Sequence, residues 1–190
     1  MRISGGIARG IPLRVTKSKS LRPATEANRE RLFSSIANQI QHKKVLDLFA
    51  GTGSYGLEAL SRGAKNAHFI EQNKRVFNDL RHNFEQVKKS SGLDEFAGRF
   101  TNRDVLGFLK QKEKNYDIVF LDPPYEDFSK LGEKVLNLLI SNGFVHHGSV
   151  LIHEAPTQET SNFINWKLKK VLGKEKKGAP NYRIYSPVLP

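Results

Sequence analysis

The sequence predicts an α/β fold in which helices cover both faces of a doubly wound, mostly parallel sheet, and three observations support this prediction. Short apolar runs typical of buried strands alternate with amphipathic helical segments from residue 44 to residue 153. A glycine-rich turn follows the first run, and a proline-rich turn follows a later one. Ligands bind to such a sheet beyond the carboxyl ends of its strands, where the strand order reverses. We therefore expect a site between the two turns.

The composition is that of a basic chain without cysteine. The 190 residues are enough for one domain over residues 25–190, preceded by a basic N-terminal arm over residues 1–24. The net charge of +12 suggests a polyanionic partner, although it can also serve solubility. The lack of cysteine excludes disulfides, thiolate zinc sites and cysteine nucleophiles, and the histidines lack metal-ligand spacing. No run reaches the ~18 apolar residues of a membrane span and no signal peptide is seen, so we expect a cytoplasmic location.

The first predicted elements follow from local patterns. Thr25 is the expected N-cap of a helix over about residues 26–41, because apolar residues from Leu32 to Ile40 recur at helical spacing. The apolar run from Val45 to Phe49 predicts a buried strand, and the helix after its glycine turn ends near Gly63. Further along we expect a strand over residues 67–71, a long helix with an apolar face over 76–87 that ends near 88–92, and a strand over 100–104.

The second half of the chain continues the alternation. Asp104 is expected to open a short helix through Leu109, and residues 117–121 form an apolar strand. A helix with an apolar face over 131–139 closes near Gly143. The remaining expected strands cover residues 149–153, 164–172 and 182–189, the last two as a pair around a lysine-rich loop.

The basic arm is a candidate surface for RNA. It has no acidic residue before Glu26, and its glycines punctuate short extended pieces, which suits contact with a phosphate backbone. An equally good interpretation is an ordinary basic tail that is packed by its own apolar residues. Arg29, on the first helix, is added to the candidate set, although most arginines so placed are simply solvated. The candidate RNA-binding residues are Arg2, Arg9, Arg14, Lys17, Lys19, Arg22 and Arg29.

The glycine turn has the spacing G-x-G-x-x-G, formed by Gly51, Gly53 and Gly56, which brings backbone close to a ligand at a helix N-terminus. Glu71 ends the next strand, 20 residues after Gly51, where an acid typically binds ribose hydroxyls. A nicotinamide dinucleotide and S-adenosylmethionine both suit this arrangement. Asp47 favours S-adenosylmethionine, because a carboxylate at that position repels a pyrophosphate and attracts a net cationic ligand.

The proline-rich turn consists of Asp122, Pro123, Pro124 and Tyr125. An exocyclic base amine is a poor nucleophile because its lone pair is delocalised into the ring. Hydrogen bonds from the amine to the Asp122 carboxylate and to the Pro123 carbonyl can hold it with its lone pair directed at an electrophilic methyl group. Tyr125 offers a face on which a base that has left its stack can lie. We therefore assign these four residues as the candidate catalytic set.

Together these motifs resemble the class I S-adenosylmethionine-dependent methyltransferases, and the whole chain resembles their bacterial RsmD family. The resemblance is carried by residues 2–6, 9–10, 21–23, 29–33, 47–53, 56–63 and 182–185. It implies a seven-stranded sheet with an N-terminal hairpin arm and methylation of a guanine N2 amine in small-subunit (16S) ribosomal RNA. It also implies an S-adenosylmethionine site formed by Asp47, Phe49, Ala50, Gly51, Thr52, Gly53, Glu71, Asp104 and Val105. The family tends to have Thr directly after Arg22-Pro23, where this chain has Ala24, which affects the details of the arm.

Three alternatives stay open at this point. Adenine-N6 methylation of DNA or RNA uses the same Asp-Pro-Pro-Tyr chemistry, although the chain lacks room for a separate DNA-reading domain. A nonenzymatic RNA-binding protein leaves Asp122 to Tyr125 without a purpose, and an NAD-dependent oxidoreductase conflicts with Asp47. The expected partner is ribosomal RNA, free or within a small subunit or its precursor, and we expect a monomer.

Overall fold

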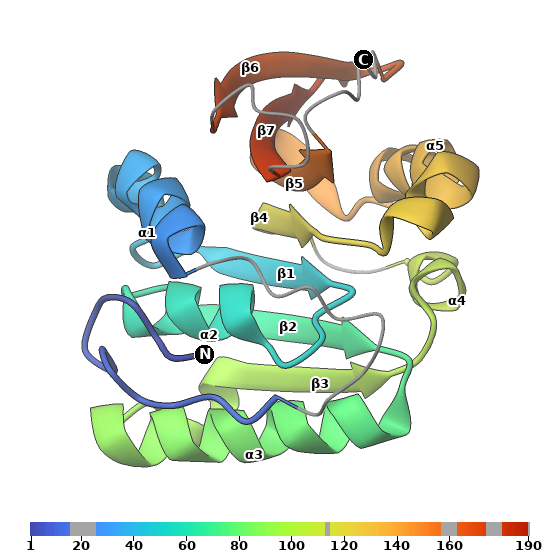
Figure 1. The fold of residues 1–190 in the computed structure, drawn as a ribbon. Helices are drawn as coiled ribbons and strands as arrows, with labels where there is room; N and C mark the ends of the chain where they lie inside the picture. Colours follow the sequence, from blue (N-terminus) through green and yellow to red (C-terminus); the bar gives the residue numbers. More distant parts are fainter. Residues whose placement is uncertain (16–25, 113–114, 157–162, 174–179, 190) are drawn as a thin grey trace.

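The protein is an α/β structure with one central sheet (Figure 1). The computed structural model describes residues 1–15, 26–112, 115–156, 163–173 and 180–189, with backbone alone for 125–130, 156 and 180. Thr25, the expected N-cap, therefore lies outside the described residues. Within the described part of the chain, no helix is both long and apolar enough to cross a membrane.

The sheet has seven strands in the order β3-β2-β1-β4-β5-β7-β6. Neighbouring strands from β3 to β5 are parallel, whereas β7 runs antiparallel between β5 and β6. This arrangement confirms the predicted doubly wound sheet, with its switch point between β1 and β4. The strands are β1 (Lys44–Leu48), β2 (Asn66–Glu71), β3 (Gly98–Asn102), β4 (Tyr116–Leu121), β5 (Val145–Pro156), β6 (Trp166–Leu172) and β7 (Pro180–Pro187).

Helices cover both faces of the sheet, as expected. One buried cluster joins the arm and the helices α1 to α3 to one face, and a second joins α4 and α5 to the other. The α-helices are α1 (Glu26–Ser35), α2 (Ser54–Ser61), α3 (Lys74–Ser91), α4 (Val105–Leu109) and α5 (Tyr125–Ser141), with short 3-10 helices η1 (Ala37–Gln39) and η2 (Glu95–Ala97).

Several predicted boundaries were wrong, and three of them are informative. The helix expected over 26–41 ends at Ser35, because Ile36 leaves helical geometry with φ −115° and ψ 13°. Ile36 and Ile40 are buried nonetheless, so the apolar spacing reflects burial of these residues and does not indicate one continuous helix. The helix α5 begins at Tyr125, before the apolar face that was predicted over residues 131–139. Finally, β5 extends to Pro156 because its second half pairs with β7.

The N-terminal arm folds back on itself and packs on the helical layer. Arg2 and Pro12 form an antiparallel bridge, and the amide of Ile3 donates to the carbonyl of Ile11 at 3.0 Å. Ile3 and Leu13 are buried in the core beside α1 to α3. Its apolar residues therefore anchor the arm as the second interpretation supposed, while Arg2 and Arg9 remain exposed.

A buried charge network attaches the arm to α1 and α2. The Glu58 carboxylate accepts hydrogen bonds from the backbone amide and the hydroxyl of Ser4, both at 2.8 Å. It also accepts from the Arg62 guanidinium at 2.8 Å and the Arg29 guanidinium at 3.4 Å, and Arg29 donates to the carbonyl of Arg2. Arg29 and Glu58 are both 0% exposed. Arg29 therefore has no free surface for RNA, and the expectation that it binds RNA is wrong.

Removing the carboxylate from this network will destabilise the fold strongly. We expect Glu58→Ala to lower the free energy of unfolding by ~3–5 kcal/mol, because it leaves the buried Arg29 charge without its partner. Urea denaturation measures this change. Glu85→Ala is the matched control, since its ion pair with Lys88 is solvent-exposed and its loss should cost no more than ~0.5 kcal/mol. Similar losses in the two variants would contradict a structural role for the network.

Candidate active site

Strand register brings the candidate residues to one edge of the sheet. Leu48 of β1 lies opposite both Ile70 of β2 and Leu121 of β4, so the glycine turn, Glu71 and Asp122 all follow at the same edge. Leu121 in turn lies opposite His153 of β5, which places Glu154 next to Asp122. Antiparallel β7 adds Tyr182, the register partner of Glu154. The two predicted turns therefore meet at the switch point.

The glycine turn requires both backbone freedom and close packing. Phe49, just before it, has a φ of 58°, a left-handed conformation that is uncommon for a large residue and concentrates at functional sites. Gly53 has a φ of 84°, and a Cβ there would lie 2.3 Å from the Leu80 side chain. A Cβ on Gly56 would lie 2.2 Å from the Phe69 ring, so this glycine lets α2 approach the sheet.

Asp47, on β1 just before the glycine turn, is hydrogen-bonded to the first turn of α2. Its carboxyl group is 1% exposed and accepts a hydrogen bond from the Gly56 amide at 2.9 Å. Burial raises the pKa of Asp47 to about 8, the charge of Glu71 adds to the rise, and the bond from Gly56 opposes it. A positive ligand nearby would favour the ionised form. A cationic ligand would therefore suit this carboxyl group better than a pyrophosphate would, and this role of Asp47 stays a prediction.

The other predicted cofactor residues surround the turn. The Glu71 carboxylate accepts from the Gly51 amide at 2.9 Å and the Asn73 amide at 2.7 Å, so it ties β2 to the glycine turn. Ala50 and Thr52 are buried within the turn. Asp104 and Val105 lie farther along the same edge, after β3. Asp104 caps α4 by accepting from the Gly107 amide at 2.7 Å, and Val105 is buried.

The Asp-Pro-Pro-Tyr turn connects β4 to α5. Asp122 is partly buried, and Pro123 is buried behind it. Pro124 is the N-cap residue of α5, with a φ of −52° and a ψ of 133°, an extended geometry that proline favours. Tyr125 begins the helix, but its side chain lies outside the described residues, so its predicted stacking role stays a prediction. Burial raises the pKa of Asp122, and the charges of Glu154 and Asp47 raise it further.

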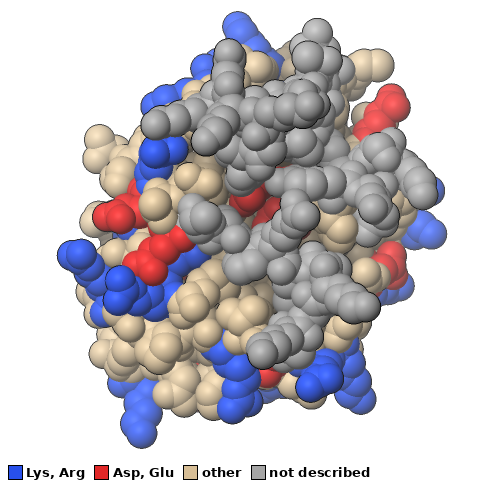
Figure 2. Space-filling view, in the orientation of Figure 1, with Lys and Arg blue, Asp and Glu red and all other residues tan. Residues whose placement is uncertain are grey.

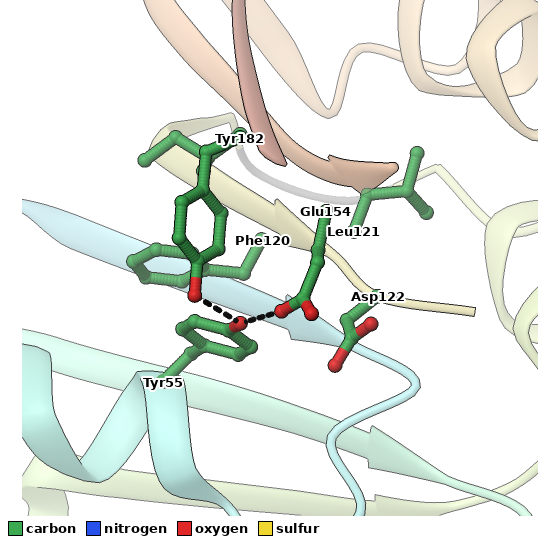
Figure 3. Close-up of a pocket in the computed structure, with 7 residues that line it drawn as sticks. Tyr55, Phe120, Leu121, Asp122, Glu154 and Tyr182 are labelled. Atoms are coloured by element: carbon green, nitrogen blue, oxygen red, sulfur yellow. Dashed lines mark hydrogen bonds between the residues drawn. The ribbon is translucent and has the colours of Figure 1, made fainter. Parts of the chain in front are cut away.

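Sequence reasoning missed three residues that line a small hollow with Asp122, namely Tyr55, Glu154 and Tyr182 (Figure 3). The Tyr55 hydroxyl donates to the Glu154 carboxylate and lies 3.1 Å from the Tyr182 hydroxyl. The Tyr55 ring also stacks on Phe120, with ring centroids 5.2 Å apart. The available signal was an acid at the end of a fifth parallel strand. Glu154 directly follows the strand predicted over residues 149–153 and therefore lies at the same edge of the sheet as Asp122.

Apart from the buried Arg29, the candidate RNA-binding residues divide into three groups. Arg2 and Arg14 are exposed but paired, Arg2 with Glu26 at 2.8 Å and Arg14 with Asp79 at 3.9 Å. Arg9 is exposed at the tip of the folded arm. Lys17, Lys19 and Arg22 lie outside the described residues. On the face shown in Figure 2, Lys and Arg side chains gather mainly around the periphery.

Comparison with known proteins identifies the family. The family model described as "Conserved hypothetical protein 95" matches residues 1–186. Ribosomal RNA small subunit methyltransferase D of Haemophilus influenzae is 37% identical over 190 residues, which cover 97% of this chain and 93% of that protein. The protein of the same name from Escherichia coli K12 is 36% identical, over 97% of this chain and 89% of its own. The chain belongs to the ribosomal RNA small subunit methyltransferase D family.

Solved structures agree with this assignment. The Escherichia coli protein yhhF has a TM-score of 0.85 and 34% identity, over 98% of this chain and 97% of its own. SMU.776, solved as a complex with SAH, has a TM-score of 0.64 over 84% of this chain and 49% of its own. Its identity is 16%, so that likeness concerns the fold alone. The predicted class I methyltransferase fold is thus confirmed.

The buried Asp47 carboxyl should make stability depend on pH in a defined direction. Its pKa is about 8 in the folded protein, so between about pH 4 and pH 8 the folded state keeps a proton that the unfolded state releases. Stability contributed by this proton is therefore lost as the pH rises through that window. We expect the melting temperature of Asp47→Asn to exceed that of the wild type by a margin that grows from pH 5 to pH 8. A margin that stays constant with pH would contradict the raised pKa.

Proposed function

We propose that this protein transfers a methyl group from S-adenosylmethionine to the exocyclic N2 amine of a guanine in small-subunit ribosomal RNA. The observation that carries the proposal is the placement of Asp122 beside the glycine turn, across the switch point of the sheet. The names of the relatives, which are ribosomal RNA small subunit methyltransferases, favour this substrate. We further propose that the protein acts in the cytoplasm as a monomer.

The residues at the carboxyl ends of the parallel strands fit S-adenosylmethionine as the methyl donor. S-adenosylmethionine, when bound, supplies an electrophilic methyl group on a positively charged sulfur. Asp47 and the glycine turn from Phe49 to Gly53 would hold its amino-acid part, and Glu71 its ribose. Asp104 and Val105 would border its adenine. Acidic groups converge here in a chain whose net charge is +12, and such a set suits a cationic ligand.

The Asp-Pro-Pro-Tyr turn would prepare the amine. Asp122 and the Pro123 carbonyl each accept one N–H bond of the guanine amine, which directs the nitrogen lone pair toward the methyl carbon. With the donor bound, a nitrogen–carbon bond would form as the carbon–sulfur bond breaks, the electron pair of that bond would leave on sulfur, and the new ammonium would lose a proton. The raised pKa of Asp122 makes its carboxylate a better proton acceptor than an exposed one. Holding both reacting groups in one geometry supplies much of the rate.

The basic surface would position the RNA. Arg9 at the tip of the arm is exposed, and Lys167, Lys169 and Lys170 are exposed on the edge strand β6. Cations at these places can contact phosphates on either side of the site while the target base enters it. Arg2, Arg14, Lys17, Lys19 and Arg22 remain in the proposed surface, and Arg29 is removed from it.

Replacing the Asp122 carboxylate should abolish most turnover without abolishing donor binding. We expect Asp122→Ala to lower the rate of methyl transfer to small ribosomal subunits by ~10²–10³, because it removes the acceptor that orients the amine. Labelled S-adenosylmethionine measures the rate, and calorimetry with S-adenosylhomocysteine checks that binding persists. Asp117→Asn is the matched control, since Asp117 lies near the opposite end of the same strand β4.

Digestion of the labelled RNA identifies the product of this reaction. N2-methylguanosine supports the proposal, whereas N6-methyladenosine would establish the alternative adenine reaction. Asp122→Ala with the turnover of the wild type would contradict the assigned role of the turn.

A further inference from the structure

Glu154 faces the same hollow as Asp122 but has no part in the transfer described above. The hollow is lined by both acids together with Tyr55, Phe120, Ile152 and Tyr182. In Figure 3 the two carboxyl groups lie side by side, Asp122 from the end of β4 and Glu154 from β5. They are close enough for the charge of Glu154 to raise the pKa of Asp122. A base amine that is held by Asp122 would therefore have Glu154 as a neighbour.

Glu154 is held in place from one side. It is 5% exposed, and the Tyr55 hydroxyl donates to its Oε2 atom. Burial raises the pKa of Glu154, while hydrogen bonds from the Tyr55 and Tyr182 hydroxyls and the charge of Arg29 oppose that rise and favour the carboxylate. The Tyr55 bond is to Oε2, so the carboxyl group keeps further acceptor capacity on its other oxygen. Among the described residues, Arg29 forms its ion pair with Glu58 and not with Glu154.

We propose that Glu154 accepts the N1–H hydrogen bond of the target guanine and thereby selects guanine over purines that lack a proton at N1. This inference rests on the proposed function. Guanine presents two adjacent groups of donors, N1–H and the N2 amine, and two adjacent carboxylates match them one to one. Adenine presents an N1 lone pair beside its amine, and a carboxylate facing that lone pair is repelled and left without a partner.

The site thus divides two tasks between two acids. Asp122 orients the N2 amine, which reacts. Glu154 is a specificity-determining residue that contacts the N1–H group of the base. Tyr55 and Tyr182 are positioning residues, because they act on the base only through Glu154. A site built to pair a donor rejects an analogue without that donor far more strongly than an apolar pocket does.

The test compares target RNA carrying guanine with target RNA carrying 2-aminopurine, which has the C2 amine but no proton at N1. We expect the wild type to prefer guanine in kcat/KM by at least ~10². Glu154→Gln should reduce that preference about 10- to 100-fold, because the carboxamide can donate to a bare N1. Glu154→Asp keeps the charge and should retain the preference even if its rate is lower. The lower intrinsic reactivity of 2-aminopurine is common to all variants and cancels when preferences are compared.

Asp122→Asn provides the control, since it should slow both substrates alike and leave the preference unchanged. Calorimetry with S-adenosylhomocysteine shows that each variant is folded and binds the cofactor product. A preference in Glu154→Gln equal to that of the wild type would overturn the inference while leaving the proposed function intact. If the wild type methylates neither RNA, although it binds S-adenosylhomocysteine, the proposed function fails and the inference fails with it.

Discussion

The structure depends on the crowding of carboxyl groups at one edge of a parallel sheet. Four parallel strands each contribute one acid, within the strand or directly after it, namely Asp47, Glu71, Asp122 and Glu154. The register of these strands places the four acids at the same edge of the sheet. Burial raises the pKa of Asp47, Asp122 and Glu154, and neighbouring carboxylates raise the pKa of Asp47 and Asp122 further. Such a cluster costs stability when no cation is present and favours binding of one. The site is therefore built for a positively charged donor within a basic protein.

The packing and hydrogen bonds of helix α2 fix the geometry of this edge of the sheet. The helix α2 must begin at the glycine turn, and Gly56 allows it to lie against Phe69 while Asp47 holds its first turn. At its other end, Glu58 joins α2 to the arm and to α1. One helix therefore connects the proposed RNA surface to the glycine turn through hydrogen bonds and packing. Arg29 of α1, which the sequence suggested as a nucleic-acid contact, is buried and serves this connection through its hydrogen bond to Glu58.

The sequence predicted the sheet, its helices and both turns, because buried parallel strands and glycine or proline turns have strong local patterns. It failed where tertiary contacts decide. Ile36 and Ile40 kept an apolar spacing after α1 had ended, and β5 continued past His153 only because β7 pairs with it. Glu154 and Tyr182 lie 28 residues apart and meet through antiparallel pairing, so no local motif could join them. Burial of Arg29 likewise depends on Glu58, which is 29 residues away.

Proton exchange on donor binding tests the central claim most directly. Calorimetric titration with S-adenosylmethionine at pH 7, repeated in buffers with different ionisation enthalpies, counts the protons exchanged. A cation bound among carboxyl groups whose pKa values are raised, such as Asp47 at about 8, must shift them toward ionisation, so the account predicts net proton release. Binding without proton release would contradict the claim that the donor binds beside the buried Asp47 carboxyl group.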